Sequence, residues 1–484
     1  MPGEPAVCTG VGEAHGTDEA GNDGGGTGPH FWVPHEAAED QGIGVSLETP
    51  EKIRKLRMGL YDKAKAEPAF RFYLLYDKVY REDILEHAYR LARSNAGAPG
   101  VDGVKFADIE ASGLEKWLAS LREELRSETY KPSPVRRVMI PKPGGGERPL
   151  GIPTIRDRVV QSAAKLVLEP IFEADMSDSA FGYREGRGAA DAVEKVHRAL
   201  CDGYTDVVDA DLSKYFDTIP HDQLMKSVAR RVSDGKMLKL IKAWLKAPVE
   251  ERDERGNRRM SGGKGSKAGT PQGGVISPLL ANIYMNRFLR VFQERGKGRE
   301  FAARLVAYAD DFVILSRGRA EAALAWTRRV MTAIGLSLNE AKTSICNARE
   351  EHFDFLGYTF GPARYWKDGR WYLAAKPSRK AIRRLKEKVR FILRRGNQRP
   401  WPAVAAALNR LLTGWTNYFS YGTCSNARRE TDHYVYDHAR NFLRRRHKVR
   451  TRGTRRFSTE RVFSELGVLR LQKARVATRT WALS

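Results

Sequence analysis

Two adjacent carboxylates, Asp310 and Asp311, lie in the segment Tyr-Ala-Asp-Asp at 308–311. Short apolar runs, 305–307 and 312–315, flank this segment. The pattern predicts two buried strands joined by a tight turn. Buried charge is costly unless it is paired or binds a metal ion, so the two acids indicate a metal site. An acidic turn exposed to water is the simpler alternative.

A third acid, Asp211, ends another apolar run within the segment 207–217. An acid at a strand end and an acidic hairpin together supply the ligands with which two divalent ions transfer a nucleotide. Hard oxygen ligands suit Mg²⁺. We therefore expect Asp211, Asp310 and Asp311 to hold two Mg²⁺ ions, provided that the strand of Asp211 lies beside the hairpin.

Three further groups near Asp211 are candidates for the same site. The backbone carbonyl of Leu212 is a possible additional metal ligand. Asp209 is two residues before Asp211, on the same face of the predicted strand, and competes with it as a ligand. Asp217 lies beyond the strand, and we expect it to cap or orient structure.

A nucleoside triphosphate needs cations around its phosphates. Lys142 and Arg148 flank a glycine turn, 144–146, between two predicted strands. Arginine grips phosphate with two hydrogen bonds, whereas lysine acts as a point charge. The hairpin is expected to fold over the triphosphate; contact with a template backbone is the alternative.

Three other residues are candidates for the nucleotide pocket. Phe216 follows Asp211 by five residues, and its ring is expected to exclude a ribose 2′-hydroxyl. The alternative is that it belongs to the hydrophobic core, as a single aromatic residue more often does. Gln272 lies in a turn that precedes a predicted helix, where it contacts the nucleotide or simply starts the helix. Lys342 is a candidate proton donor to the departing pyrophosphate, or a solvated lysine.

The charge of the chain indicates a polyanionic partner. The 484 residues carry a formal net charge of +25, and 41% are hydrophobic, so a sizeable core is available. Nucleic acid is the simplest partner for such a charge. Residues 1–51 contain no Lys or Arg, whereas paired arginines recur after residue 382.

Cysteine usage and hydropathy point to a reducing compartment. Four cysteines are scattered without zinc-ligand spacing or a disulfide pattern, which fits a reducing cytoplasm. No run of 18 apolar residues occurs, so no membrane span is expected.

The order of predicted elements indicates an α+β fold. Helical patterns cover 51–93, 155–172 and 188–200, and strands are predicted at 135–140, 148–152, around Asp211 and in the acidic hairpin. After residue 377 the chain is helical and strongly basic. Residues 1–45 are rich in Gly, Asp and Glu and are predicted to be disordered.

Seven ordered blocks of this sequence resemble the group II intron-encoded reverse transcriptase/maturases of bacteria. The blocks lie at 97–103, 140–150, 180–184, 211–217, 269–273, 308–311 and 355–358. The resemblance covers about residues 50–475. It implies a catalytic triad of Asp211, Asp310 and Asp311, a nucleotide pocket with Lys142, Arg148, Phe216 and Gln272, and a right-hand polymerase of fingers, palm and thumb.

The resemblance also implies a division of the chain. It predicts an acidic N-terminal segment (1–48), fingers (49–200), a palm (201–375), a helical thumb or maturase domain X (376–450) and a basic C-terminal segment (451–484). The segment 411–419 looks like domain X. No paired Cys-x-x-Cys follows it, so no endonuclease is expected.

The implied activity is RNA-dependent DNA synthesis by a protein that helps its own intron RNA to splice. The implied partners are intron RNA, target or primer DNA and deoxynucleotides. Basic residues of the C-terminal part would bind the RNA by phosphate contact and shape. The candidate RNA-binding residues are Arg383, Arg384, Arg394, Arg395, Arg444, Arg445 and Arg446. Alternatives are a retron, diversity-generating or CRISPR-associated reverse transcriptase, or a non-catalytic splicing cofactor.

Overall fold

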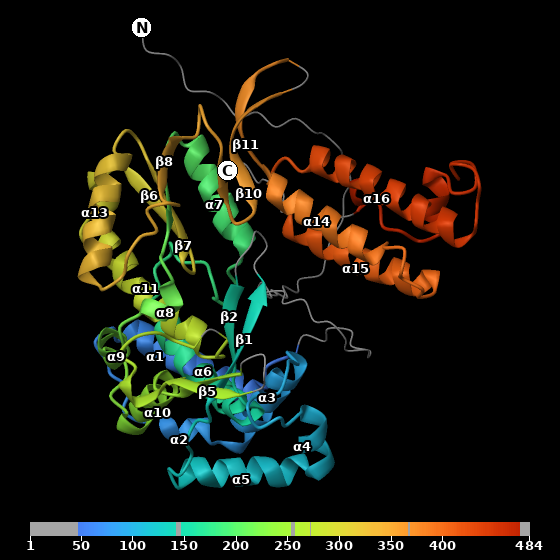
Figure 1. The fold of residues 1–484 in the computed structure, drawn as a ribbon. Helices are drawn as coiled ribbons and strands as arrows, with labels where there is room; N and C mark the ends of the chain where they lie inside the picture. The colour runs from blue at the N-terminus through green and yellow to red at the C-terminus, as the bar shows by residue number, and fades with distance from the viewer. Residues whose placement is uncertain (1–46, 142–146, 253–256, 272, 366–367, 475–484) are drawn as a thin grey trace.

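The computed structural model describes residues 47–141, 147–252, 257–271, 273–365 and 368–474. Helices and three sheets make up this part of the chain, as the α+β prediction requires (Figure 1). The acidic N-terminal segment falls almost entirely outside the described residues, so its predicted disorder is not tested.

Five helices form the N-terminal layer. They are α1 (Glu51–Ala66), α2 (Tyr76–Val79), α3 (Glu82–Ser94), α4 (Phe106–Ser112) and α5 (Leu114–Arg126). The helical pattern predicted over 51–93 is interrupted between α1 and α2. Glu67, which precedes Pro68, has φ −124° and ψ 83°, because a residue before proline avoids the α region.

A four-stranded sheet in the order β2-β1-β4-β5 lies next to these helices. Its strands are β1 (Val135–Pro141), β2 (Glu147–Ile152), β4 (Pro248–Arg252) and β5 (Arg258–Gly262), with a short η1 (Gly263–Gly265). The predicted hairpin of β1 and β2 is confirmed. The second hairpin was not predicted, because β5 is charged and almost wholly exposed and so shows no apolar alternation.

Helices connect the sheets and cover them. They are α6 (Ile155–Glu173), α7 (Ala189–Cys201), α8 (Tyr215–Thr218), α9 (His221–Ala229), α10 (Gly235–Leu245), α11 (Ser277–Glu294), α12 (Lys297–Glu300) and α13 (Ala320–Ala333). Helix α6 is buried almost all round, and α1 and α3 pack against it.

The central sheet has the order β6-β7-β3-β8, with all neighbours antiparallel. Its strands are β3 (Asp206–Asp211), β6 (Ala303–Tyr308), β7 (Asp311–Ser316) and β8 (Ser344–Asn347). Val208 and Phe312 belong to an apolar core with α6, α11 and α13, and Val207 and Val313 to a second core with α7 and the C-terminal helices. The sheet is therefore buried on both faces.

The C-terminal part begins with a third sheet, in the order β11-β10-β9. Its strands are β9 (Phe353–Phe355), β10 (Tyr358–Arg364) and β11 (Trp371–Pro377). Then follow α14 (Arg379–Ile392), α15 (Trp401–Tyr418), α16 (Ser425–Arg446), a π-helical turn η2 (Arg461–Glu465) and η3 (Leu471–Lys473). Figure 1 shows α14, α15 and α16 as a layer beside the body.

Candidate active site

Three acids meet at one end of the central sheet. Asp211 is the last residue of β3 and lies directly opposite Asp311, the first residue of β7. Asp310 lies in the turn between β6 and β7, after Ala309, whose φ is +58°. The strand of Asp211 is therefore beside the acidic hairpin, as the metal-site hypothesis needs.

Desolvation and mutual repulsion disfavour the charged forms of these acids. Desolvation by the surrounding protein makes the largest contribution to raising the pKa of Asp311, which is about 7. The negative charges of Asp310, Asp211 and Asp209 also raise it. Asp311 nevertheless keeps contact with solvent. Burial also raises the pKa of Asp310. Such carboxylates favour a bound cation, because a divalent ion removes the repulsion that raises the pKa.

The side chains are not yet arranged as ligands. Within the described ranges, no three His, Cys, Asp or Glu side chains surround a common point as a metal would require. The Oδ2 atom of Asp211 accepts hydrogen bonds from Lys342 Nζ at 2.9 Å and Asn339 Nδ2 at 3.2 Å. The residues fit a divalent ion by their chemistry and by the pairing of Asp211 with Asp311, although Asp211 is engaged by Lys342 and Asn339.

Two alternative ligands also lie near this edge. Asp209 lies opposite Val313 in the same ladder, and desolvation, then the charges of Asp211 and Asp354, raise its pKa to about 6. Leu212 forms an antiparallel bridge with Leu338. The hydrogen bonds of that bridge use the amide of Ser213 and the carbonyl of Asp211, not the carbonyl of Leu212. Asp217 lies in α8, beyond the strand, where it was expected.

Among the predicted nucleotide-binding residues, Arg148 and Phe216 lie near the acids. Arg148 is on β2, and its positive charge acts on the pKa of both Asp310 and Tyr183. Phe216 is 6% exposed, and its ring is 6.5 Å from that of Tyr183. Phe216 is therefore a core residue that also borders the acidic edge.

Of the other three predicted pocket residues, the structure describes only Lys342. Lys142 and Gln272 lie outside the described residues. Lys342 is described, and its hydrogen bond to Asp211 raises its pKa above the ordinary value. Its ammonium thus pairs with one of the three acids of the predicted metal site.

The loop before α11 contacts both β2 and the segment that carries Phe216. The amide of Thr270 donates to the carbonyl of Phe216 at 2.7 Å. A Cβ on Gly273, whose φ is +106°, would lie 2.2 Å from the carbonyl oxygen of Gly151. Only glycine fits there, since β2 and the loop touch through their backbones.

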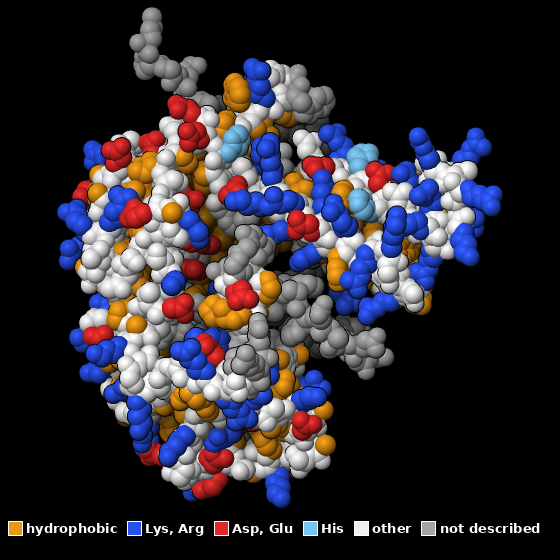
Figure 2. Space-filling model, in the orientation of Figure 1, with side chains coloured by type: hydrophobic (Ala, Val, Ile, Leu, Met, Phe, Trp, Pro, Cys, Tyr) orange, Lys and Arg blue, Asp and Glu red, His pale blue; other side chains and the backbone are white. Residues whose placement is uncertain are grey.

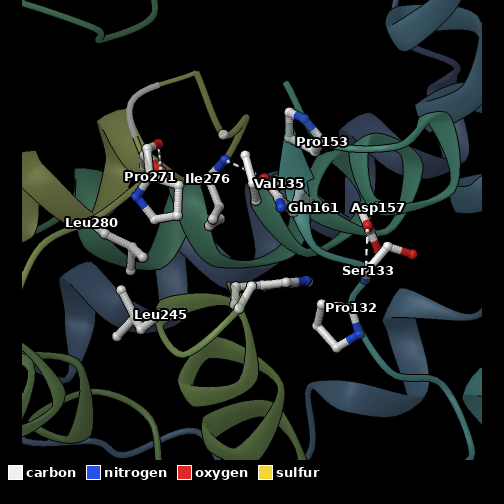
Figure 3. Close-up of a pocket in the computed structure, with 14 residues that line it drawn as sticks. Pro132, Ser133, Val135, Pro153, Asp157, Gln161, Leu245, Pro271, Ile276 and Leu280 are labelled. Atoms are coloured by element: carbon white, nitrogen blue, oxygen red, sulfur yellow. Dashed lines mark hydrogen bonds between the residues drawn. The ribbon is translucent and has the colours of Figure 1, made fainter. Parts of the chain in front are cut away.

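Behind this loop, a small pocket lies between the loop and helices α6 and α10 (Figure 3). The amide of Ile276 donates to Gln161 Oε1 at 3.4 Å across it. Its volume of about 10 Å³ suits at most a single water. The pocket is thus a packing feature that supports the loop, not a ligand site.

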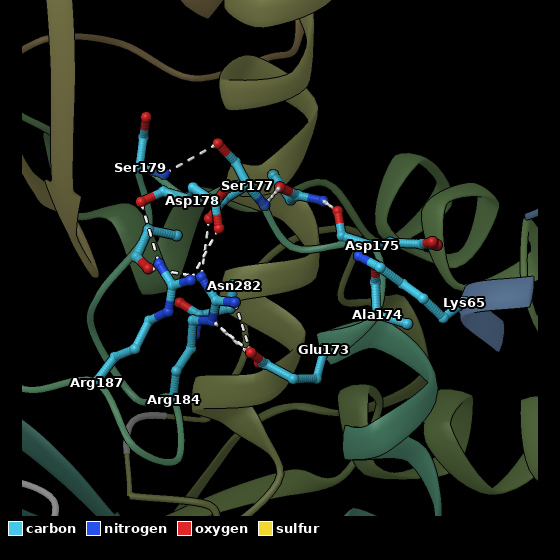
Figure 4. Close-up of polar contacts among 12 residues, drawn as sticks. Lys65, Glu173, Ala174, Asp175, Ser177, Asp178, Ser179, Arg184, Arg187 and Asn282 are labelled. Atoms are coloured by element: carbon cyan, nitrogen blue, oxygen red, sulfur yellow. Dashed lines mark hydrogen bonds and ion pairs between the residues drawn. The ribbon is translucent and has the colours of Figure 1, made fainter. Parts of the chain in front are cut away.

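A second set of contacts holds the segment that touches the acidic turn. The guanidinium of Arg184 donates to the carbonyls of Ser177 and Ala180 and pairs with Glu173 (Figure 4). Asn282 donates to the carbonyl of Gly182 at 2.7 Å.

This support reaches the turn through Gly182. A Cβ on Gly182 would lie 2.4 Å from the backbone nitrogen of Ala309. Sequence reasoning noted the block 180–184 as a landmark but missed that it supports the turn, because its partner is more than 120 residues away.

The C-terminal helix α15 contacts the third sheet at the turn between β9 and β10. The hydroxyl of Tyr418, at the end of α15, donates to the carbonyl of Leu356 at 2.9 Å. The hydroxyl of Tyr358 donates to the carbonyl of Tyr418 at 3.0 Å. The charges of Tyr308 and Asp311 add to burial in raising the pKa of Tyr418 to about 12.

Basic side chains crowd the surface of these helices (Figure 2). Arg383, Arg384, Arg394 and Arg395 are exposed on or just after α14. Arg444, Arg445 and Arg446 end α16. Arg446 donates to the carbonyls of Arg399 and Gln398, so part of this last group holds neighbouring loops.

Two family models match the chain. Residues 140–360 match the reverse transcriptase (RNA-dependent DNA polymerase) model, and residues 382–463 match the group II intron maturase-specific domain. A reverse transcriptase domain implies a polymerase that depends on a divalent metal. The match at 382–463 favours the intron-encoded class over the other reverse transcriptases considered.

Curated relatives include two bacterial proteins. Protein YkfC of Escherichia coli is 37% identical over 343 residues, which cover 63% of this chain and 87% of YkfC. The group II intron-encoded protein LtrA of Lactococcus lactis is 36% identical over 217 residues. That match covers 44% of this chain and 34% of LtrA, so the chain spans about a third of the length of LtrA.

A solved telomerase from Candida albicans is similar over 74% of this chain and 71% of its own, with a TM-score of 0.39 and 14% identity. None of the helices in the described part of the chain is long and apolar enough to cross a membrane. By its two domain matches and its relatives, the chain belongs to the group II intron-encoded reverse transcriptase/maturases, RNA-directed DNA polymerases with a right-hand fold.

Proposed function

We propose that this chain copies group II intron RNA into DNA and that Asp211, Asp310 and Asp311 hold two Mg²⁺ ions for the reaction. The observation that carries the proposal is the pairing of Asp211 with Asp311 across β3 and β7, with the pKa of Asp311 raised to about 7. Bound there, the ions would lower the pKa of the attacking 3′-hydroxyl and stabilise charge on the leaving pyrophosphate.

The protein's own residues would bind and orient the deoxynucleotide. Arg148 and Lys142 are proposed to grip the triphosphate, and Gln272 to contact the nucleotide. Phe216 would exclude the ribose 2′-hydroxyl. Lys342, whose pKa is raised by its hydrogen bond to Asp211, would donate its proton to the departing pyrophosphate.

We infer fingers at 49–200, a palm at 201–375 and a thumb at 376–450 followed by the basic segment 451–484. The arginines of the last two regions would bind intron RNA by phosphate contacts, and target DNA would supply the primer. The protein would act in a bacterial cytoplasm, at the nucleoid when it is on DNA.

Primer extension with the variants Asp310→Asn and Asp211→Asn tests the proposal. Each variant should lose DNA synthesis on poly(rA)/oligo(dT) by at least a hundredfold and retain its affinity for intron RNA, because that affinity comes from distant cations. Asp217→Asn, outside the strand, is the matched control and should keep most activity. A triad variant that extends primers at more than a few per cent of the wild-type rate would contradict the assignment.

A further inference from the structure

The hairpin of β10 and β11 projects from the body near the top of Figure 1 and carries an exposed aromatic ring. Trp371 is 65% exposed and the neighbouring Tyr365 is 39% exposed. A buried tryptophan stabilises a protein far more than an exposed one, because its large apolar surface is costly to leave in water. An exposed aromatic pair at the end of a hairpin therefore indicates a contact surface.

A cation is already paired with the ring. Arg364 is the cross-strand neighbour of Trp371, and its guanidinium carbon is 5.0 Å from the ring centroid. The amide of Tyr365 donates to the carbonyl of Arg370 at 2.8 Å. Arg370 is 67% exposed and is held by Asp368 at 2.7 Å. The ring and two guanidinium groups are thus positioned before a ligand arrives, which lowers the entropy lost on binding.

The hairpin end is separate from the acidic edge. Strand β11 runs from Trp371 to Pro377, about 20 Å at 3.3 Å per residue. Its far end lies beside the Leu356–Gly357 turn, where Ser378 donates to the carbonyl of Gly357. The basic helix α14 starts at Arg379, just beyond this far end of β11.

We propose that this hairpin end binds single-stranded nucleic acid, with an unpaired base stacked on Trp371 and adjacent phosphates bound by Arg364 and Arg370. Aromatic rings flanked by arginines suit single strands, because every unpaired base offers a face for stacking and every phosphate a charge for arginine. The overall charge of +25 favours a nucleic acid over a protein partner. The inference does not depend on polymerisation at the acidic edge.

Photo-crosslinking of the full chain gives a direct test. A 12-nucleotide single strand containing 5-iodouracil, made once as RNA and once as DNA, is irradiated with the protein and the crosslinked peptides are identified by mass spectrometry. We expect a crosslink to Trp371 in at least one arm, and the stronger arm identifies the natural strand. The same crosslink should form in Asp310→Asn, so failure of the catalytic assignment and failure of this one are distinguishable.

Variants provide the second measurement. Trp371→Ala should weaken binding of the single strand by about fivefold or more, the lower end of the effect of one base–aromatic stack, and Trp371→Phe should recover most of the loss. Because stacking is uncharged, Trp371→Ala should leave the salt dependence of affinity unchanged, whereas Arg364→Gln should make it shallower. A blunt duplex of the same length should bind Trp371→Ala as it binds the wild type.

The control is Tyr73→Ala, since Tyr73 is 70% exposed and lies in the N-terminal layer. An equal loss in Tyr73→Ala, an unchanged affinity of Trp371→Ala, or the absence of a crosslink to Trp371 in both arms would each overturn the proposal. Thermal melting of both variants should match the wild type, because both side chains lie at the surface.

Discussion

Lys342 Nζ lies 2.9 Å from Asp211 Oδ2, so a lysine ammonium pairs with the same carboxylate that faces Asp311 across the sheet. A metal ion that binds Asp211 must displace this lysine or share the carboxylate with it. We therefore expect a metal ion and the lysine to compete for this carboxylate.

Removing the competitor should strengthen metal binding. We expect Lys342→Gln to lower the Mg²⁺ concentration for half-maximal primer extension by roughly 1.5- to 5-fold, which corresponds to about 0.2–1 kcal/mol for an exposed ion pair. The KM for deoxynucleotide should rise, because a phosphate contact is lost. A Mg²⁺ titration at fixed nucleotide measures the first effect. Lys342→Arg keeps the pair and is the control; an unchanged Mg²⁺ midpoint in the glutamine variant would refute the competition.

The raised pKa of Asp311 predicts how stability depends on pH. The folded, metal-free protein binds this proton more readily than the unfolded chain, so ionised Asp311 destabilises the fold above about pH 7. The penalty decreases as the pH falls below 7. In EDTA, Asp311→Asn should therefore raise Tm at pH 8.5, and the gain should shrink towards pH 5.

Solvent contact at Asp311 reduces the size of this effect, so its direction and pH dependence are the test. Added Mg²⁺ should stabilise the wild type more at pH 8.5 than at pH 6, since the ion binds the ionised carboxylates. Calorimetry at several pH values checks both statements. A gain in Tm that is the same at pH 8.5 and pH 5 would show that the substitution acts through packing alone.

The acidic hairpin of β6 and β7 was predictable because its signal is local. The apolar runs around Asp310 and Asp311 have the length and composition of buried strands, and both strands are present. The pairing with Asp211 was stated as a condition, because strand order depends on contacts about 100 residues apart. The metal role of the triad stays a prediction.

What sequence reasoning missed depends on contacts between distant backbones. Gly182 is unremarkable in sequence, yet its hydrogen atom faces the backbone of Ala309 across a gap that no side chain fits. Strand β8 was missed because its four residues are half-buried or exposed and alternate weakly. Neither a close backbone approach nor a short edge strand leaves a periodic pattern in one sequence.

Phe216 is both a core residue and the proposed barrier to ribonucleotides. A smaller side chain should leave room for a 2′-hydroxyl, so Phe216→Val should raise the ratio of ribonucleotide to deoxynucleotide use by roughly tenfold. Single-nucleotide extension with each substrate measures this ratio. Phe172→Val, a similar truncation in the same core, is the control. If both variants raise the ratio equally, the effect comes from general loosening and not from the sugar contact.

The exposed arginines of α14 allow RNA binding to be separated from catalysis. We expect the combined change of Arg383, Arg384, Arg394 and Arg395 to Gln to weaken intron RNA binding and splicing more than extension of a short primer. Each lost phosphate contact should reduce the slope of log affinity against log salt by somewhat under one unit. The buried Leu385 and Val389 are unchanged, so α14 should still pack.

Binding titrations at four salt concentrations, with extension assays on the same preparations, check this expectation. The matched control neutralises four exposed cations of the N-terminal layer, namely Lys105, Lys116, Arg122 and Arg126. These residues lie far along the chain from the maturase-specific match, so the same loss of charge there should affect intron RNA less. Equal losses in both sets would mean that net charge alone determines RNA affinity. Equal losses of RNA binding and primer extension in the α14 variant would mean that this helix grips primer and template as a general thumb.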